Sequence, residues 1–395
     1  MNISEIYNQV YYVGVNNRTA DRFEEMWPIP EGVSYNSYLI AGEKVALVDT
    51  VCINQCLQFL NNISAVIGNK PIDYLIINHM EPDHSGSIQI IKERYPDIKI
   101  VGNSKTADMI KGYYAITENV VCVKDGETLD LGGGKVLKFV FTPMVHWPET
   151  MMTYIEGDKI LFSGDAFGCF GALNGAVVDA DMNTDAYFPE MYRYYSNIVA
   201  KYGVTVQAAM KKLAGTPIGY ICSTHGPVWH ERIAEVLDIY DRLSRFEAEK
   251  GVVIAYGSMY GHTEEAAEII TANLAKLGIK NIKLYNLSKT HVSYVLADIM
   301  RYKGLIIASP TYSGDLFPPV GNLVKAISVR DIKNRSVAYF GSYTWAPAAT
   351  KRMTAALENL KVDFVSSPFD MKQAPTDSTI TACQALANDM AASIK

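Results

Sequence analysis

The distribution of apolar residues in the first half of the chain predicts short strands mixed with helices. Apolar residues spaced as on one face of a helix cover Leu57–Ile67, and a polar segment, residues 78–86, follows a short apolar run. The chain therefore opens with β-rich sequence in which one strand leads directly into a polar loop. The strands predicted in this part are Val10–Val15, Ser37–Ala41, Lys44–Val51 and Ile72–Ile77.

Strand and helix patterns stay mixed up to about residue 225. Helices are predicted at Ile88–Arg94 and Lys105–Lys111, and strands at Ile98–Val101, Val136–Thr142, Met151–Ile155 and Lys159–Phe162. The segment Glu231–Glu249 is charged and carries its apolar residues on one helical stripe, and the character of the sequence changes at Gly251. We therefore place a domain boundary near residue 249.

Beyond this boundary, strands and helices alternate regularly with short connections. The predicted order is strand Val252–Tyr256, helix Glu264–Leu277, strand Ile282–Asn286, a helix, strand Gly304–Ala308, a helix after Val320, strand Ser336–Phe340 and a helix from about Thr350. This alternation predicts an α/β domain with an open, doubly wound parallel sheet.

Length, charge and cysteine content narrow the class of protein. A chain of 395 residues exceeds what one core usually organises, which agrees with two domains, 1–249 and 250–395. A net charge of −6 without a basic tract argues against a nucleic-acid partner. Six scattered cysteines indicate reduced thiols rather than a disulfide scaffold. Without an apolar leader or a bilayer-length apolar run, we expect no membrane contact and a cytoplasmic location.

Three loops of the second domain are candidate ligand-binding segments, because doubly wound sheets bind ligands at the carboxyl ends of their strands. Residues 258–263 place two hydroxyls and several backbone N–H groups at a helix N-terminus, which suits a phosphate even without Lys or Arg. Residues 309–314 and 341–345 carry aromatic side chains that can enclose a planar ring. Neither a P-loop nor a G-x-G-x-x-G motif is present.

The first of these loops alone also fits a capped strand-to-helix turn, but the three loops together resemble those of flavodoxins. The resemblance covers Gly251–Lys395 and implies a flavodoxin-like domain that binds FMN. The residues that it places around FMN are Ser258, Met259, Tyr260, Gly261, His262, Thr263, Ser309, Pro310, Thr311, Tyr312, Ser313, Gly314, Gly341, Ser342, Tyr343, Thr344 and Trp345.

The first domain carries a denser cluster of chemically active side chains. His79, Glu81, Asp83 and His84 lie within six residues directly after a predicted buried strand. One histidine at a strand end is usually structural, and one aspartate there often caps a turn. Two carboxylates and two imidazoles at one strand edge, however, would cost on the order of several kcal/mol unless paired or bound to metal. His146, Asp165 and His225 follow later predicted strands, and the whole set predicts a binuclear transition-metal site.

The spacing of this cluster resembles the H-x-H-x-D-H motif of the metallo-β-lactamase superfamily, with Glu81 in place of the second histidine. This substitution adds a hard ligand that favours iron over zinc. Together with the flavodoxin-like tail, the motif resembles A-type flavodiiron proteins, which implies a metallo-β-lactamase-like αββα sandwich across residues 1 to about 245. By this resemblance one iron binds His79, Glu81 and His146, the second binds Asp83 and His225, Asp165 bridges, and His84 either binds the second iron or supports a ligand.

The same resemblance implies an FMN- and diiron-dependent oxidoreductase that reduces dioxygen to water, nitric oxide to nitrous oxide, or both. It also implies a head-to-tail homodimer, or a dimer of such dimers, in which each flavin serves the partner's iron pair. A rubredoxin-like donor is expected, because no C-x-x-C pair follows the second domain. The sequence does not decide between the two gases or identify the donor.

Two other functions are compatible with parts of the sequence. One is a zinc hydrolase of the metallo-β-lactamase superfamily with an accessory flavodoxin-like domain, which Glu81 and the flavin loops disfavour. The other is a non-catalytic electron carrier with a structural metal. Seven candidate ligands exceed what one closed tetrahedral site requires and count against this second alternative.

Overall fold

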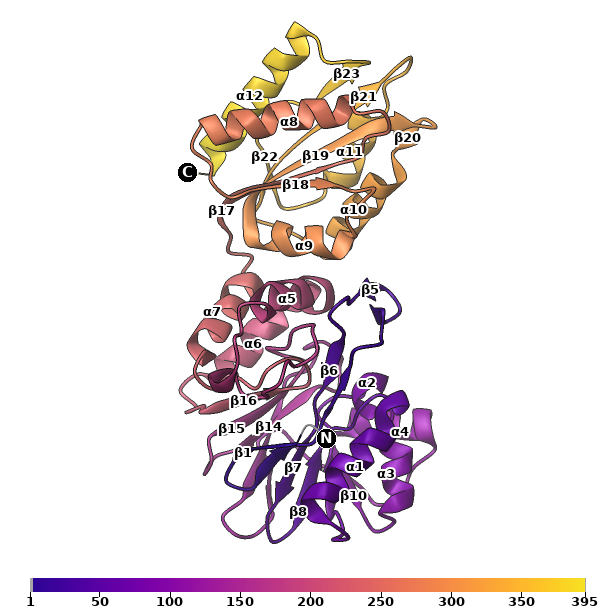
Figure 1. Ribbon diagram of the computed structural model, residues 1–395, viewed down its shortest axis with the longest axis vertical. Coiled ribbons are helices and arrows are strands. Elements are labelled where there is room, and N and C mark those ends of the chain that lie inside the picture. Colours follow the sequence, from indigo (N-terminus) through magenta and orange to yellow (C-terminus); the bar gives the residue numbers. More distant parts are fainter. Residues whose placement is uncertain (1–2, 395) are drawn as a thin grey trace. The chain divides into compact units, whose positions relative to one another are not determined.

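The computed structural model describes residues 3–394, which form two compact units (Figure 1). The first unit consists of the chain up to Tyr194 together with Val204–Asp241, and the second of Tyr195–Gly203 together with the chain from Arg242 onward. The domain limits 1–249 and 250–395 stay a prediction. Among the described residues, no helix combines the length and apolar character needed to cross a membrane.

The first unit is an αββα sandwich built on two sheets. The first sheet contains, in order across it, β1 (Ser4–Tyr7), β2 (Val10–Tyr12), β7 (Tyr38–Ala41), β8 (Val45–Val48), β9 (Tyr74–Ile76), β10 (Lys99–Gly102) and β11 (Val120–Cys122). The second contains β12 (Thr128–Asp130), β13 (Val136–Phe141), β14 (Met151–Ile155), β15 (Ile160–Gly164) and β16 (Tyr220–Ser223). Every residue of β8, β9, β14 and β15 is buried, which explains their nearly continuous apolar sequences.

In Figure 1, α1, α3 and α4 lie beside the first sheet, and α5, α6 and α7 are grouped above β16 of the second. The helices are η1 (Ile53–Gln55), α1 (Cys56–Ile67), α2 (Pro82–Ser85), α3 (Ile88–Arg94), α4 (Ser104–Tyr114), η2 (Asp179–Asp181), α5 (Tyr187–Tyr194), α6 (Gly203–Leu213) and α7 (Ile233–Ser244). Two short ribbons, β3 (Val15–Asn17) with β6 (Val33–Tyr35) and β4 (Arg22–Phe23) with β5 (Trp27–Pro28), complete the unit.

Asn78 joins the two sheets at the start of the polar segment that follows β9. Its carbonyl oxygen accepts a hydrogen bond from the Met151 N–H at 3.0 Å, and its side-chain oxygen accepts one from the Thr153 hydroxyl at 2.7 Å. Both partners belong to β14 of the second sheet, whereas β9 lies between β8 and β10 in the first. The loop after β9 is therefore fixed to both sheets.

The second unit is a parallel sheet with the strand order β18-β17-β19-β21-β22, which is the flavodoxin order 2-1-3-4-5. Its strands are β17 (Glu249–Tyr256), β18 (Ile282–Asn286), β19 (Tyr302–Tyr312), β20 (Asp315–Leu316), β21 (Ser336–Tyr343), β22 (Asp363–Phe364) and β23 (Phe369–Lys372). Its helices are η3 (Tyr195–Val199), η4 (Ala200–Tyr202), α8 (His262–Lys276), α9 (Val292–Arg301), α10 (Pro318–Val329), α11 (Ala349–Leu357) and α12 (Asp377–Ser393).

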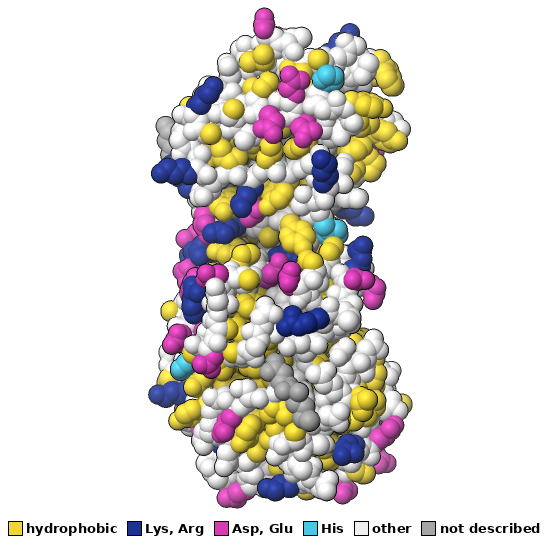
Figure 2. Space-filling model, in the orientation of Figure 1, with side chains coloured by type: hydrophobic (Ala, Val, Ile, Leu, Met, Phe, Trp, Pro, Cys, Tyr) yellow, Lys and Arg dark blue, Asp and Glu magenta, His cyan; other side chains and the backbone are white. Residues whose placement is uncertain are grey.

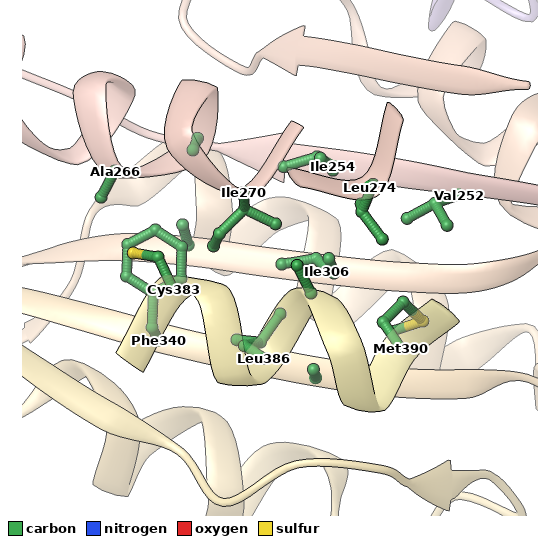
Figure 3. Packing of buried hydrophobic residues seen from close by; sticks show 14 of the residues in the cluster. Val252, Ile254, Ala266, Ile270, Leu274, Ile306, Phe340, Cys383, Leu386 and Met390 are labelled. Atoms are coloured by element: carbon green, nitrogen blue, oxygen red, sulfur yellow. The ribbon is translucent and has the colours of Figure 1, made fainter. Parts of the chain in front are cut away.

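The core of this unit lies between the sheet and the pair α8 and α12. Ile270 and Leu274 of α8 face Leu386 of α12 across a layer that includes Ile306 of the sheet, and all four side chains are almost fully buried (Figure 3). Burying each such aliphatic side chain contributes about 1.5–3 kcal/mol. The remaining helices α9, α10 and α11 lie on the opposite face of the sheet (Figure 1), so the carboxyl ends of the strands are left free for a ligand.

Most strands and helices occur where the apolar pattern predicts them, but three predictions of local structure are wrong. The segment 78–86 is not all loop, because α2 forms within it with a proline at its first turn. The helix predicted over Glu231–Glu249 ends at Ser244, and Glu249 already begins β17. β19 and β21 both continue past their predicted ends, because they pair with each other and with β20 and β23, so residues 309–312 and 341–343 lie in strands rather than in loops.

The surface agrees with the low net charge. On the face that Figure 2 presents, acidic and basic side chains are interspersed rather than collected in one large area of a single sign.

Candidate functional site

The loops after four strand ends bring the seven predicted metal ligands together in the first unit. His79 follows β9, and Asp165 and His225 follow β15 and β16. The ends of β15 and β16 are neighbours because these strands run parallel with Gly164 opposite Ser223. The side chains form two groups, one of His79, Glu81, His146 and Asp165 and the other of Asp83, His84 and His225.

In the first group, four ligand atoms lie within 4.8 Å of one another. Glu81 Oε2 lies 3.2 Å from His79 Nε2 and 3.1 Å from His146 Nε2. Asp165 Oδ2 lies 3.4 Å and 3.1 Å from the same two nitrogens. Two imidazoles and two carboxylates around one point suit a transition metal of intermediate softness, whereas no thiolate takes part.

In the second group, Asp83 Oδ2 lies 3.2 Å from His84 Nε2 and 3.3 Å from His225 Nε2. The sequence left the role of His84 open. In the structure its side chain is fully buried, and its Nε2 lies among the other candidate ligand atoms of this group. This placement makes His84 a candidate ligand of the second metal rather than a supporting residue.

Asp165 connects the two groups. Its Oδ2 faces the first group, and its Oδ1 lies 3.0 Å from His84 Nε2 and 3.8 Å from His225 Nε2. Thr224 donates a hydrogen bond to Oδ1. Burial alone would raise the pKa of the Asp165 carboxyl, yet the neighbouring His84 and His79 hold it well below its usual range. A carboxylate with one oxygen toward each group has the geometry of a bridging ligand.

The carboxylates in turn raise the pKa values of the two histidines in the first group. Burial opposes protonation of His79, but Asp165, Glu149 and Glu81 raise its pKa to about 10. In the same way Asp165 and Glu81 outweigh burial and raise the pKa of His146 to about 9. The first group thus stabilises positive charge at its centre, as a metal cation requires.

Hydrogen bonds outside the groups fix the orientation of two histidines. Since a carbonyl oxygen can only accept, His225 Nδ1 carries the proton that it donates to the Ser34 carbonyl at 2.7 Å. His79 Nδ1 faces Glu149 Oε1 at 2.8 Å, and this oxygen also accepts from the Met80 N–H at 2.9 Å. In both residues Nε2 is the ring nitrogen that faces the other candidate ligands and can bind a metal.

The buried atoms of the second group provide a test of whether metal fits. Within the described residues, both carboxylate oxygens of Asp83 and the Nε2 atoms of His84 and His225 are buried without a partner in hydrogen-bonding geometry. Buried polar atoms rarely stay unpaired in a folded protein, so these converging atoms require another bonding partner. A metal ion bound by the carboxylate and the two imidazoles satisfies them.

Two acidic residues near the site were not found from the sequence because they are distant from the ligand motif. Asp49, just after β8, accepts from the Asn78 N–H at 2.8 Å and so fixes the start of the ligand loop. Glu24, between β4 and β5, lies beside Glu81, and loss of hydration together with the Glu81 carboxyl raises the pKa of Glu24 to about 7. Neither residue has a local sequence signal, since each matters only through the folded contact.

The second unit contains a cavity of about 660 Å³ at the carboxyl ends of β17, β19 and β21. All three predicted flavin loops line it, together with Ala346, Ala348 and Gln373, which the sequence did not indicate. The predicted residues in its wall are Ser258, Met259, Tyr260, His262, Thr263, Pro310, Thr311, Tyr312, Ser313, Gly314, Ser342, Tyr343, Thr344 and Trp345.

Three residues that were predicted to contact the flavin do not line this cavity, and each is instead part of the local fold. Gly261 precedes α8 with a φ of 98°. Ser309 accepts from the Phe317 N–H at 3.1 Å within the core. A Cβ on Gly341 would lie 2.1 Å from Asp370 Oδ1, so a glycine is needed there for close strand packing. None of the three is part of the cavity wall.

Comparisons with known proteins agree with a metal site in the first unit and a flavin site in the second. Residues 33–226 match the family model described as ODP family beta lactamase, and residues 254–385 match the flavodoxin family model. An anaerobic nitric oxide reductase flavorubredoxin of Vibrio vulnificus is 34% identical over 361 residues, covering 89% of this chain and 72% of the relative. The flavorubredoxin of Shigella dysenteriae is 30% identical over 384 residues, covering 96% and 80%.

Solved structures are similar over the whole chain. Rubredoxin oxygen:oxidoreductase from Desulfovibrio gigas superposes with a TM-score of 0.95 at 28% identity, covering 100% of this chain and 98% of that one. The flavodiiron protein from Giardia intestinalis gives a TM-score of 0.94 at 25% identity, covering 99% and 96%. Fold and sites thus define a protein with a metallo-β-lactamase-like metal unit and a flavodoxin-like unit. The chain belongs to the flavodiiron protein family, and the resemblance seen in the sequence is confirmed.

Proposed function

We propose that this chain reduces dioxygen, nitric oxide or both at two iron ions held by the seven clustered ligands, with electrons relayed through FMN in the second unit. The relatives named above, a nitric oxide reductase and a rubredoxin oxygen:oxidoreductase, support an FMN- and diiron-dependent oxidoreductase acting on one of these gases. The observation that carries the proposal is Asp165, whose two carboxylate oxygens face two separate groups of ligand atoms.

Within this proposal, His79, Glu81 and His146 hold one iron, and Asp83, His84 and His225 hold the other. Three carboxylates, those of Glu81, Asp83 and Asp165, make the ligand set anionic and hard, which favours iron over zinc. With one carboxylate oxygen facing each group, Asp165 would serve both ion sites, and the bound metals would supply the redox chemistry.

The flavin cavity is proposed to hold FMN with its phosphate at the N-terminus of α8. Gly261, which precedes this helix, donates its N–H to Ser258 Oγ at 3.1 Å and makes no side-chain cap, so the first amides of α8 remain available to an anion. The hydroxyls of Thr263 and Ser342 lie 2.8 Å apart and connect the first and third loops. Exposed aromatic rings of Tyr312 and Trp345 in the cavity wall suit the faces of a planar ring.

The electron count matches the proposed reactions. When bound, the iron pair and FMN can supply two electrons each, which suffices for dioxygen to two waters with four protons, or twice over for two nitric oxides to nitrous oxide and one water with two protons. The chain supplies the ligand geometry and excludes bulk water, since His79, His84 and His225 are fully buried. No residue of the two groups suits one gas alone, so the choice between them is an outcome of the experiment.

We further propose a head-to-tail homodimer in the cytoplasm, in which each flavin serves the partner's iron pair, with a rubredoxin-like protein as donor. The name of the Desulfovibrio gigas enzyme supports the donor. The six cysteines are all free in the structure, in agreement with a reducing compartment.

The experiment is stopped-flow spectroscopy of anaerobically reduced, metal-analysed protein mixed separately with dioxygen and with nitric oxide. We expect iron and FMN to be oxidised together over several turnovers with one of the gases, which then names the substrate. Inertness toward both gases, or zinc in place of iron together with hydrolytic activity, would contradict the proposal and favour the zinc hydrolase.

A further inference from the structure

One hydroxyl in the wall of the flavin cavity is held in a fixed hydrogen-bonding role. The side chain of Thr311, near the end of β19, lines the cavity. Its Oγ1 accepts hydrogen bonds from the N–H groups of Ala348 at 3.0 Å and Ala349 at 3.2 Å, where α11 begins. A threonine hydroxyl has two lone pairs and one proton. Both lone pairs of Thr311 are therefore in use, and only its proton remains for another partner.

This proton is available to a ligand in the cavity. Within residues 3–394, the two bonds from α11 are the only hydrogen bonds of the Thr311 side chain. Other hydroxyls of the wall keep a lone pair free. Those of Thr263 and Ser342 bond to each other at 2.8 Å with either as the donor, and that of Ser258 accepts from one N–H. Thr311 thus differs from them, because it can donate to a ligand but cannot accept from it.

Thr311 lies away from the position proposed for the phosphate. The phosphate is proposed at the N-terminus of α8, whereas Thr311 bonds to α11, on the opposite face of the sheet (Figure 1). Thr311 directly precedes Tyr312 in the second loop, and its partner Ala348 follows Trp345 in the third. Tyr312 and Trp345 are the aromatic residues proposed to face the flavin ring. A ring held between them has the Thr311 hydroxyl at its edge.

The ring side of the cavity contains no charged side chain that could stabilise a negative ring. Among the described residues of the wall, none is Lys, Arg, Asp or Glu, and the one imidazole, that of His262, belongs to α8. Reduction of FMN by two electrons with one proton taken up at N5 leaves a negative charge shared by N1 and the carbonyl oxygens of the ring. Neutral hydrogen-bond donors must therefore stabilise this charge.

We propose that Thr311 tunes the redox potential of the flavin, because its hydroxyl donates to an acceptor on the edge of the FMN ring and binds the reduced ring more strongly than the oxidised one. This inference rests on the proposed binding of FMN in the cavity. The acceptor is N1 or a carbonyl oxygen, since N5 carries a proton in the reduced ring. A hydrogen bond to a charged acceptor is about twice as strong as one to a neutral acceptor.

The size of the effect follows from this difference in strength. We expect the Thr311 hydroxyl to favour reduced over oxidised FMN by about five- to tenfold. For a two-electron couple this ratio corresponds to about 20–30 mV in the midpoint potential. Removal of the hydroxyl should therefore lower the potential of bound FMN and make the flavin harder to reduce.

The test is the two-electron midpoint potential of FMN bound to the full-length protein, measured against reference dyes at slightly alkaline pH. In Thr311→Val, which keeps the shape of the side chain without the hydroxyl, we expect the potential to fall by about 20–30 mV. In Thr311→Ser, which keeps the hydroxyl, we expect the wild-type potential. The control is Thr381→Val, which changes an exposed threonine of α12 outside the cavity wall and should leave the potential unchanged.

The potential distinguishes this role from a purely structural one. Thr311→Val also removes two hydrogen bonds from the start of α11, and this loss can loosen the third loop and weaken FMN binding. Such weakening acts on oxidised and reduced FMN alike and leaves the potential as in wild type. If Thr311→Val binds no FMN, Thr311→Cys takes its place. Because a thiol is a weak donor, this variant should lower the potential by a smaller amount.

The outcomes also separate this inference from the proposal on which it rests. If the wild-type protein binds no FMN, the flavin assignment fails, and the role of Thr311 fails with it. If the wild-type protein binds FMN but the potential is unchanged or higher in the variants without a full-strength donor, the flavin assignment stands and Thr311 is not a tuning residue. A lower potential in Thr311→Ser as well would attribute the effect to packing rather than to the hydroxyl, and would equally overturn the inference.

Discussion

Glu149 controls the orientation of a metal ligand without being one. Its Oε1 is shared between His79 Nδ1 and the Met80 N–H, and its side chain is fully buried. A carboxylate in this position holds the imidazole ring at a fixed angle and makes Nε2 a stronger donor to the metal. The strength of iron binding at the first group therefore depends on a residue about seventy positions away in the sequence.

Replacing this carboxylate should weaken the iron site while leaving the ligands in place. We expect Glu149→Gln to lower iron affinity by about 10- to 100-fold, because the neutral amide no longer holds the proton of His79 as strongly. Iron retained per chain after equilibration with a graded series of chelator concentrations measures the effect. The matched control is Glu156→Gln, an exposed glutamate beyond the end of β14. Equal iron affinity in both variants would remove Glu149 from the site.

The local motif predicts ligands better than it predicts the residues that support them. His79, Glu81, Asp83 and His84 lie so close together in the sequence that only a shared site accounts for them. Asp49 and Glu149 are ordinary acidic residues until the fold brings them to the backbone of the same loop. Likewise Gln373 reaches the flavin cavity only because the end of β23 lies beside that of β21, where its N–H bonds to the Tyr343 carbonyl.

At the scale of secondary-structure elements, the turn after β16 places His225 by close packing. Gly226 has a φ of 76°, and a Cβ at this position would lie 2.2 Å from Cys169 Sγ. The Asn36 side chain also donates to the Gly226 carbonyl at 2.8 Å. The end of β16, the loop after β15 and the segment after β6 are therefore packed against one another at a point where no side chain fits.

We expect Gly226→Ala to destabilise the first unit and to release iron from the second ligand group. The left-handed backbone costs about 1–2 kcal/mol for a residue with a side chain, and the clash with Cys169 adds about 1–3 kcal/mol. Thermal unfolding combined with iron analysis measures both effects. Gly215→Ala is the control, because Gly215 has a φ of 81° and a Cβ added there would meet nothing within 4 Å. An unfolding temperature no lower than that of the control would show that the close contact is relieved without cost.

The bounds of helices with regular apolar spacing could be predicted from the sequence. The lengths of strands that depend on pairing with another strand could not. α1 and α3 agree with the predicted helices to within one residue. By contrast, the length of β21 depends on β23, which pairs Gly341 with Asp370 beyond the last apolar position of the strand. α5 and α6 were not predicted, although apolar residues recur at helical spacing in both, for example Val206, Ala209 and Leu213 in α6.

At the scale of the whole molecule, the proposed electron transfer between the two chains of a dimer can be tested by measuring activity in mixed dimers. Asp165→Asn should destroy the iron pair and leave the flavin site, while Ser258→Asp should place a negative charge in the phosphate site and leave the iron pair. Each homodimer should be inactive. In a head-to-tail heterodimer, one flavin and one iron pair on opposite chains remain intact.

We therefore expect a heterodimer purified with two different tags to regain about half of the wild-type turnover per dimer. Anaerobic turnover with dioxygen or nitric oxide, whichever gas the wild-type protein consumes, provides the measurement. If electrons pass within one chain instead, both flavin–iron pairs of the heterodimer are broken and no activity returns. The two homodimers, measured with the same donor, serve as controls for residual activity.

The contacts of Asn78 have a consequence for how the protein can be observed. Its backbone and side chain both bond to β14, so the ligand loop cannot move away from the second sheet unless the two sheets separate at this edge. Since Asp165 and His225 belong to the second sheet and His79 to the first, such a separation pulls the metal ligands apart. Release of the bound iron on heating is thus a built-in reporter of the opening of the sandwich.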